Sequence, residues 1–419
     1  MREDVNALVH RIDSGRMREL LVDFVNLQSV NDRALAASEW YAGLLRASGA
    51  VEARVRHEGL IAPAVVAGFP GTMRAPALQF VGYLALPGPV RRRAFSVNGH
   101  VYGRAVGTCA AGLIAAAEAA RVLATDSPLP GGGLLFLARP IGDPSAGTED
   151  FARLIGQGIV GKAAVITSGP SRLVPLEGLG SCMFQVVFTA PGEHGTMSGP
   201  EATVIDAAHM LCSALRRRQR ALHRECTSLA GPEAVVVGRM GGGEHFELTP
   251  GTSWVQGVWR FGPSRGERST RAEIEGLARR AAAACGATAV TTFRVGRQPF
   301  VLDRAFPLVR ELQASYRAVW GSDLPEGGCR VPSDMPIFLA HGVPAVCHGP
   351  RQVSVRAEGG EECVAIDDLV RLAEVYLRLS VSILRESTPD GGSALSGGDA
   401  VINTARESQA ALVGQGRSQ

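Results

Sequence analysis

Short apolar runs alternate with helical stretches along about the first 170 residues, and this pattern limits the fold more than any other in the chain. Four runs have the composition of buried strands, at residues 62–70, 77–86, 132–140 and 163–169. Alanine-rich or amphipathic helical stretches lie between them, at 109–123 and 148–158. Strands that alternate with helices favour a mostly parallel sheet with helices on its faces. We therefore expect an α/β sandwich.

The pattern changes between residues 178 and 293. Longer strand candidates at 181–192, 253–263 and 287–295 are separated there by helical stretches at 202–222 and 271–285. This order predicts a compact two-layer α+β insert of ordinary domain size. We predict one α/β domain from residues 1–177 and 294–387, interrupted by an insert at 178–293. The Gly/Ser-rich residues 388–419 are expected to be a disordered tail.

Composition restricts the class of function. The chain has 419 residues, of which 46% are hydrophobic and 20% charged, as in ordinary globular proteins. The net charge of +3 and short basic runs give no reason to expect nucleic acid, and no apolar run is long enough for a membrane span. The eight cysteines form neither a disulfide framework nor a zinc knuckle, so we expect a cytoplasmic protein with reduced thiols. The single lysine, Lys162, nearly excludes lysine-based covalent catalysis.

Four segments, in order and spacing, resemble the M20 family of zinc peptidases and deacylases, which includes acetylornithine deacetylase-like and aminoacylase-like enzymes. They are LLVDFVNLQSVN, VNGHVYGRAVGTCAAGLIAAAEAARVL, GPEAVVVGRMGGGEHFELTP and SDMPIFLAHGVPAVCHGP. The resemblance implies an α/β catalytic domain, an inserted lid and dimerisation domain, and a homodimer. It also implies two zinc ions and a glutamate that activates the bridging water.

The residues at the family's zinc-site positions do not have the expected side chains. The resemblance places the ligands and their helpers on Tyr83, Ala85, Thr108, Arg139, Pro140, Gly169 and either Ala357 or Glu358. Zinc needs imidazole, thiolate or carboxylate donors in a tight cluster, and isolated carboxylates do not make such a site. We therefore predict no catalytic metal and no other cofactor. Tyr83, as a hydrogen-bond donor or general acid, and Thr108 become catalytic candidates.

Two further catalytic candidates come from different arguments. The resemblance places His194 on the histidine that polarises the scissile carbonyl across a dimer interface. Cys109 begins the helical stretch 109–123, where helix N-terminal amides can lower the pKa of a thiol. A free cysteine among small apolar residues is more often a packing residue, and this alternative is the stronger of the two for Cys109.

The substrate-binding candidates depend mainly on the same resemblance. Arg260 falls on the arginine that binds the substrate carboxylate, and Glu247 replaces an asparagine of the family. The other candidates are Asp334, Glu358 and His348. For Asp334, structural capping is an equal alternative, and for His348 the alternative is a core role. Such a site would no longer activate water but would still bind the substrate's carbonyl and carboxylate groups. It suits reactions in which the substrate carries its own nucleophile.

These features lead to one main hypothesis and two alternatives. The main one is a metal-independent enzyme on this scaffold that performs acyl transfer, amide formation or cyclisation on a small amino-acid-derived molecule, as in bacterial specialised metabolism. The first alternative is a non-catalytic ligand-binding or partner protein. The second is a zinc-dependent amidohydrolase whose ligands lie at other positions.

Overall fold

The structure is a computed structural model in which the chain divides into two compact units. Unit 1 comprises Met1–Pro175, Leu302–Glu326 and Asp334–Gln419, and unit 2 comprises Leu176–Val301 and Gly327–Ser333. The structure describes residues 5–28, 34–71, 75–84, 93–126, 129, 132–140, 144–169, 173–190, 202–226, 228–243, 245, 248–294, 296–331, 333–350 and 362–386. The predicted tail at 388–419 lies outside these residues.

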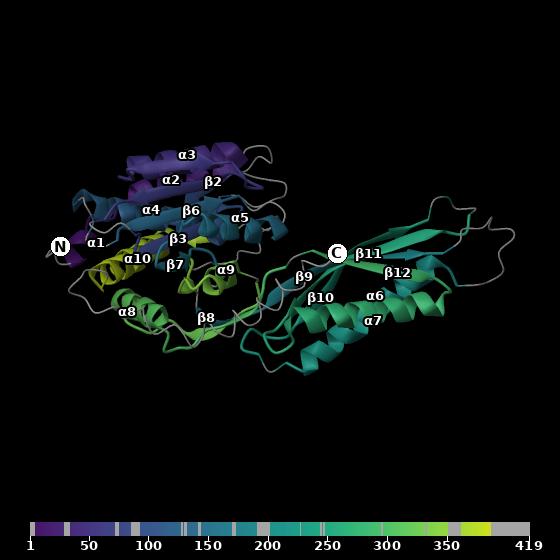
Figure 1. Cartoon of the computed structure of the whole chain (residues 1–419). Coiled ribbons are helices and arrows are strands. Elements are labelled where there is room, and N and C mark those ends of the chain that lie inside the picture. The colour runs from purple at the N-terminus through teal and green to yellow at the C-terminus, as the bar shows by residue number, and fades with distance from the viewer. Residues whose placement is uncertain are drawn as a thin grey trace. The chain divides into compact units, whose positions relative to one another are not determined.

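Unit 1 is built on a six-stranded sheet in the order β1-β2-β6-β3-β7-β15 (Figure 1). Its strands are β1 (Glu52–Arg56), β2 (Ala64–Phe69), β3 (Leu78–Tyr83), β6 (Leu134–Arg139), β7 (Ala163–Ile166) and β15 (Ala345–Cys347). The four strands from β6 to β15 are parallel, whereas β1 and β2 are antiparallel to their neighbours. Every residue of β3 and β6 is buried, as expected of strands covered on both faces. The predicted α/β sandwich is confirmed.

The helices of unit 1 lie on both faces of this sheet. They are α1 (Val5–Val9), α2 (Ser14–Gln28), α3 (Ala34–Ala47), α4 (Ala111–Leu123), α5 (Pro144–Gly156), α8 (Pro307–Trp320), α9 (Met335–Ala340) and α10 (Ile366–Glu386). On β3, the Phe80 ring packs at a tilt against Tyr376 of α10, with 5.2 Å between the centroids, and Gly82 lies directly against Leu113 of α4. Successive strand residues point to opposite faces, so Tyr83 faces away from α4 and α10.

The opposite face carries α5 and α9, whose rings Phe151 and Phe338 lie 5.8 Å apart. A small second sheet in unit 1 has the order β16-β5-β4, from Glu362–Ala365, His100–Gly103 and Phe95–Val97. Among the described residues, one helical stretch, Val106–Leu123, is apolar and long enough to span a membrane, but 89% of it is buried inside the protein. It is the central helix of this unit.

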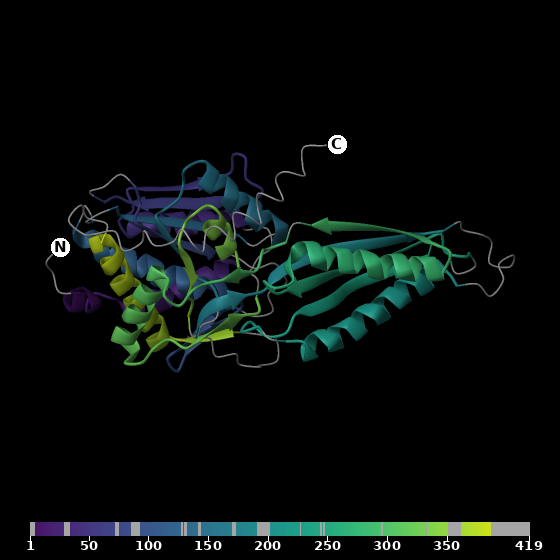
Figure 2. The same cartoon turned by 60° about the horizontal axis from the view of Figure 1, so that its bottom comes forward.

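Unit 2 contains a four-stranded antiparallel sheet in the order β10-β11-β9-β12. The strands are β9 (Gly180–Thr189), β10 (Ala234–Gly242), β11 (Thr252–Phe261) and β12 (Thr288–Arg294). Helices α6 (Val204–Arg224) and α7 (Gly266–Ala284) run along one face of this sheet (Figures 1 and 2). Strand β10 was not predicted, because its second half is glycine-rich and mostly exposed and therefore resembles a loop.

The boundaries of the insert differ from the predicted 178–293. Unit 2 extends to Val301 and includes the later segment Gly327–Ser333. The cause is a three-stranded sheet in which β8 (Val174–Gly178) lies between β13 (Phe300–Val301) and β14 (Glu326–Cys329). Strands this short carry no periodic signal, so the sequence could not place these boundaries.

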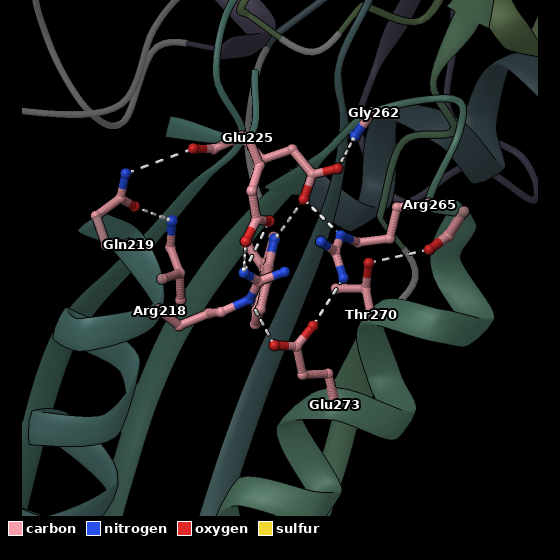
Figure 3. Close-up of polar contacts among 11 residues, drawn as sticks. Arg218, Gln219, Glu225, Gly262, Arg265, Thr270 and Glu273 are labelled. Atoms are coloured by element: carbon pink, nitrogen blue, oxygen red, sulfur yellow. Dashed lines mark hydrogen bonds and ion pairs between the residues drawn. The ribbon is translucent and has the colours of Figure 1, made fainter. Parts of the chain in front are cut away.

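A chain of alternating charges joins the helices and strands of unit 2 (Figure 3). Arg218 on α6 contacts Glu225 at 2.9 Å and Glu273 at 2.6 Å. Arg265 contacts the other oxygen of Glu273 at 2.7 Å and Glu233 at 2.6 Å. Apart from Glu225, these side chains are mostly buried, and each guanidinium bridges two carboxylates. The network has a structural role, since it connects α6, α7 and the start of β10.

Candidate functional site

The candidate site lies at the carboxyl edge of the parallel strands in unit 1. Ligands of open α/β sheets bind at this edge, because the loops that follow the strands meet there. Tyr83 is the last residue of β3, and Arg139 is the last residue of β6. The two are direct neighbours across the strands, so their side chains leave the sheet on the same face. His348 directly follows β15 at the same edge.

Tyr83 donates a hydrogen bond from its hydroxyl to Oδ2 of Asp334. Tyr83 is 6% exposed and Asp334 is fully buried. Asp334 immediately precedes α9, but its side chain makes no capping hydrogen bond to that helix. The side chain of Asp334 therefore binds Tyr83 rather than the first N–H groups of α9. The geometry gives instead a buried phenol–carboxylate pair at the sheet edge.

Arg139 is also buried and also has a carboxylate partner. Its Nη2 lies 3.2 Å from Oδ2 of Asp150 on α5, and both side chains are at most 1% exposed. Asp150 accepts hydrogen bonds from the backbone N–H groups of Ile61 at 2.7 Å and Ala62 at 3.2 Å. Within the described parts of the chain, Nε and Nη2 of Arg139 have no hydrogen-bond acceptor. The guanidinium is charge-compensated but incompletely hydrogen-bonded.

Thr108 lies in a π-helical turn, Val106–Ala110, that leads into α4. The backbone N–H groups of Gly107 and Thr108 donate to Glu362 Oε2 at 2.8 and 2.7 Å, and the Thr108 hydroxyl donates to Oε1. A carboxylate at this place compensates the unpaired N–H groups at the start of the helix. Ala105 before the turn has φ of 57°, a left-handed conformation that non-glycine residues rarely adopt. The Thr108 hydroxyl is thus already hydrogen-bonded to Glu362.

Glu362 was not identified from the sequence. It is the first residue of β16 and pairs with Gly103 of β5, which brings it to the turn at Thr108. The two residues are 254 positions apart in the chain. An acidic residue beside a short strand has no distinctive spacing, and only the strand pairing reveals its position.

Cys109 is 1% exposed. Burial raises the pKa of its thiol far above the usual value, the Glu362 carboxylate raises it further, and Arg104 lowers it. A thiol with a raised pKa is a poor nucleophile at neutral pH, because little of it is thiolate. These facts favour the packing role over the nucleophilic role that the helix position suggested.

His348 is 2% exposed and lies between two tyrosine rings. Tyr316 and Tyr376 present their rings edge-on at centroid distances of 6.1 and 5.7 Å. Burial lowers the pKa of His348 from 6.5 to about 4, and its Nδ1 has no hydrogen-bond partner among the described residues. This environment favours a neutral core histidine over a substrate ligand.

Arg260 belongs to unit 2 and is half-buried on β11. Its neighbours Trp259 and Phe261 point into the core beneath α6 and α7, so Arg260 lies on the opposite face of that sheet. The remaining candidates, His194, Glu247 and Glu358, lie outside the described residues. Of the predicted site residues, the structure brings Tyr83 and Asp334 into direct contact.

The side chains at this edge do not match a dizinc centre. At the described positions where the resemblance places the family's ligands and general base, the chain has two hydroxyls, a guanidinium, a proline and a glycine, from Tyr83, Thr108, Arg139, Pro140 and Gly169. Hydroxyl and guanidinium groups are hydrogen-bond donors rather than good zinc ligands. No group of three or more His, Cys, Asp or Glu side chains in the described part of the chain could hold a metal ion.

Comparison with known proteins gives a family and a fold. Residues 85–381 match the model of peptidase family M20/M25/M40. A tripeptidase from Staphylococcus aureus has a similar structure, with a TM-score of 0.71 at 16% identity over 90% of this chain and 100% of that one. The dipeptidase Dug1p from Saccharomyces cerevisiae gives 0.72 at 11%, covering 91% and 99%. Human carnosine dipeptidase 1 gives 0.70 at 12%, covering 91% and 100%. No curated protein sequence matches the chain.

Proposed function

The chain belongs to peptidase family M20/M25/M40, and from this premise we propose that it is a metal-independent enzyme acting on an amide or acyl group of a small amino-acid-derived substrate. The buried hydrogen bond between Tyr83 and Asp334 carries this proposal. It lies where the family would be expected to have a zinc-binding histidine, and its atoms suit proton transfer better than metal binding. The tripeptidase and dipeptidase relatives support a substrate built from amino acids.

The reaction is acyl transfer, amide formation or cyclisation, with an amine of the substrate as the nucleophile. As the amine attacks the acyl carbon, its proton passes to the Tyr83 oxygen, and the Tyr83 proton passes to Asp334. A new C–N bond forms and the bond to the leaving group breaks. The Tyr83 hydroxyl gives its proton to the leaving group, and Asp334 returns its proton to the Tyr83 oxygen. Binding both reacting groups at one site replaces the activation of water, because orientation alone supplies a large rate enhancement.

His194, Arg260 and a homodimer complete the proposal. His194 polarises the carbonyl, and Arg260, half-buried on β11, binds a substrate carboxylate. The insert joins two copies of the chain so that His194 reaches the partner's site. These roles are the ones that the family resemblance implies.

Metal content and product formation test the proposal together. The purified protein is treated with a chelator, its zinc content is measured, and products from N-acyl amino acids and dipeptides with added amines are followed by mass spectrometry. We expect turnover that survives chelation. In the Tyr83→Phe variant, kcat is expected to fall about 100-fold or more, the usual contribution of a general acid or base.

Tyr41→Phe is the matched control. The Tyr41 hydroxyl is also buried and donates to the backbone oxygen of Leu113 at 3.1 Å, away from Tyr83. This variant loses one buried hydrogen bond, as Tyr83→Phe does, and should keep its kcat. Stoichiometric zinc with chelator-sensitive activity would overturn metal independence. Ligand binding without any turnover would favour the non-catalytic alternative.

A further inference from the structure

The unsatisfied atoms of Arg139 form one particular edge of its guanidinium. Nε and Nη2 carry parallel N–H groups, and this pair is the fork that binds both oxygens of a carboxylate. In Arg139 these are the two nitrogens that lack a hydrogen-bond acceptor in the described structure. Buried charged donors are rarely left in this state, because they have lost water without gaining a partner.

Asp150 does not fill this role. It lies at ion-pair distance from Nη2, but its two oxygens accept from the backbone N–H groups of Ile61 and Ala62. Asp150 is therefore held by the backbone and offsets the charge of Arg139 from one side. The fork edge is left with its bidentate geometry and no acceptor.

The position of Arg139 connects this fork to the candidate site. Arg139 and Tyr83 end adjacent parallel strands in direct register, about 5 Å apart, and leave the sheet on the same face. The hydroxyl of Tyr83 is the group to which we assign proton transfer, and its acceptor Asp334 is buried behind it. An anion held by Arg139 would lie beside this reacting group.

We propose that Arg139 is an anchor that binds a carboxylate of the substrate beside Tyr83, in addition to the carboxylate contact proposed for Arg260. A monoanion fits better than a phosphate dianion, because the carboxylates of Asp150 and Asp334 are already buried at this edge. That the bound carboxylate belongs to a substrate rests on the proposed function. That Arg139 can bind a carboxylate follows from its own Nε and Nη2, which lack an acceptor in the described part of the chain.

Binding of a matched pair of probes tests this anchor without turnover. N-acetylalanine and its primary amide differ only in the carboxylate, and inorganic phosphate serves as the dianion. Their affinities are measured by calorimetry and by the shift in Tm. We expect the carboxylate to bind at least about ten-fold more tightly than the amide and to raise the Tm by about 2–4 °C near saturation. Phosphate is expected to have no comparable effect.

Variants of Arg139 test whether this residue causes the preference for the carboxylate over the amide. Arg139→Gln should abolish the preference for the carboxylate, and Arg139→Lys should lose most of it while keeping a charge beside Asp150. Arg153→Gln is the control, since it removes an equal charge from a half-exposed side chain on α5 and should leave the preference unchanged. The double variant Arg139→Gln with Asp150→Asn replaces the buried ion pair by neutral amides if the single variant does not fold.

The outcomes separate this inference from the proposed function. Equal affinity for acid and amide, a preference for phosphate, or a carboxylate preference that survives in Arg139→Gln would each overturn the anchor. So would the absence of binding by any of the three probes. Chelator-sensitive activity would overturn the metal-independent reaction and leave the result on Arg139 standing.

Discussion

Acidification should destabilise the folded protein through His348. Its imidazole is 2% exposed between Tyr316 and Tyr376, and burial lowers its pKa from 6.5 to about 4. Between these two pH values the unfolded chain binds a proton that the folded chain does not bind. The free energy of unfolding therefore falls as the pH falls below about 6.5, by about 1.4 kcal/mol at pH 5.5 and about 3 kcal/mol at pH 4. Above pH 6.5 this contribution is constant.

Urea unfolding of the wild type and the His348→Phe variant isolates this effect. Phenylalanine fits the aromatic surroundings and removes both the titrating group and the unsatisfied Nδ1. Measured at about pH 7.5, 6.5, 5.5 and 4.5, the wild type should lose stability more steeply than the variant, with the difference growing below pH 6.5. His57→Gln, at an exposed position, should keep the wild-type slope. Parallel losses in wild type and His348→Phe would refute the argument.

Three further predictions concern buried charges and thiols. Glu362→Gln should lower the free energy of unfolding, measured in urea, by about 1–3 kcal/mol, because a neutral amide binds the N–H groups of Gly107 and Thr108 less strongly than a carboxylate does. An unchanged urea midpoint of unfolding would show that these hydrogen bonds do not stabilise the fold. Cys226, which is exposed, should react with a thiol reagent in the native protein, whereas Cys109 should react only after unfolding, as mapped by mass spectrometry; rapid native labelling of Cys109 would restore it as a nucleophile. Glu118→Gln should cost about 3 kcal/mol, since this fully buried carboxylate binds two arginines, whereas Glu19→Gln at the surface should cost less than about 1 kcal/mol in the same assay.

The fold could be predicted where burial determines the sequence pattern. Strands β3 and β6 are covered on both faces, and they appear in the sequence as continuous apolar runs. Strand β10 is mostly exposed and rich in glycine, so tertiary pairing with β11 decides its structure. The ends of unit 2 depend on the two-residue β13 and the four-residue β14, which both pair with β8 and are too short to show a local pattern.

The site was less predictable, because its contacts join distant parts of the chain. Tyr83 and Asp334 were each candidates, but their hydrogen bond spans 251 residues and follows from the positions of β3 and α9. Asp150 and Glu362 were missed, since an acidic residue on an ordinary helix or strand gives no local signal of its partner. Arg139 was recognised as a replaced family residue, and only its burial beside Asp150 indicated a role for its fork edge.

Three of the positions where the resemblance places a zinc ligand or the general base share one physical arrangement. Each has a hydrogen-bond donor, and each donor is paired with a carboxylate from another segment of the chain. The pairs are Tyr83 with Asp334, Arg139 with Asp150, and Thr108 with Glu362. A metal site gathers several acceptors around one cation, whereas here each acceptor already has its own donor. Restoring one ligand, for example by Thr108→Asp, would place a second carboxylate against Glu362 without supplying the other ligands. Building a metal site from these three pairs would therefore require several coupled changes, because each donor and its carboxylate must be exchanged together.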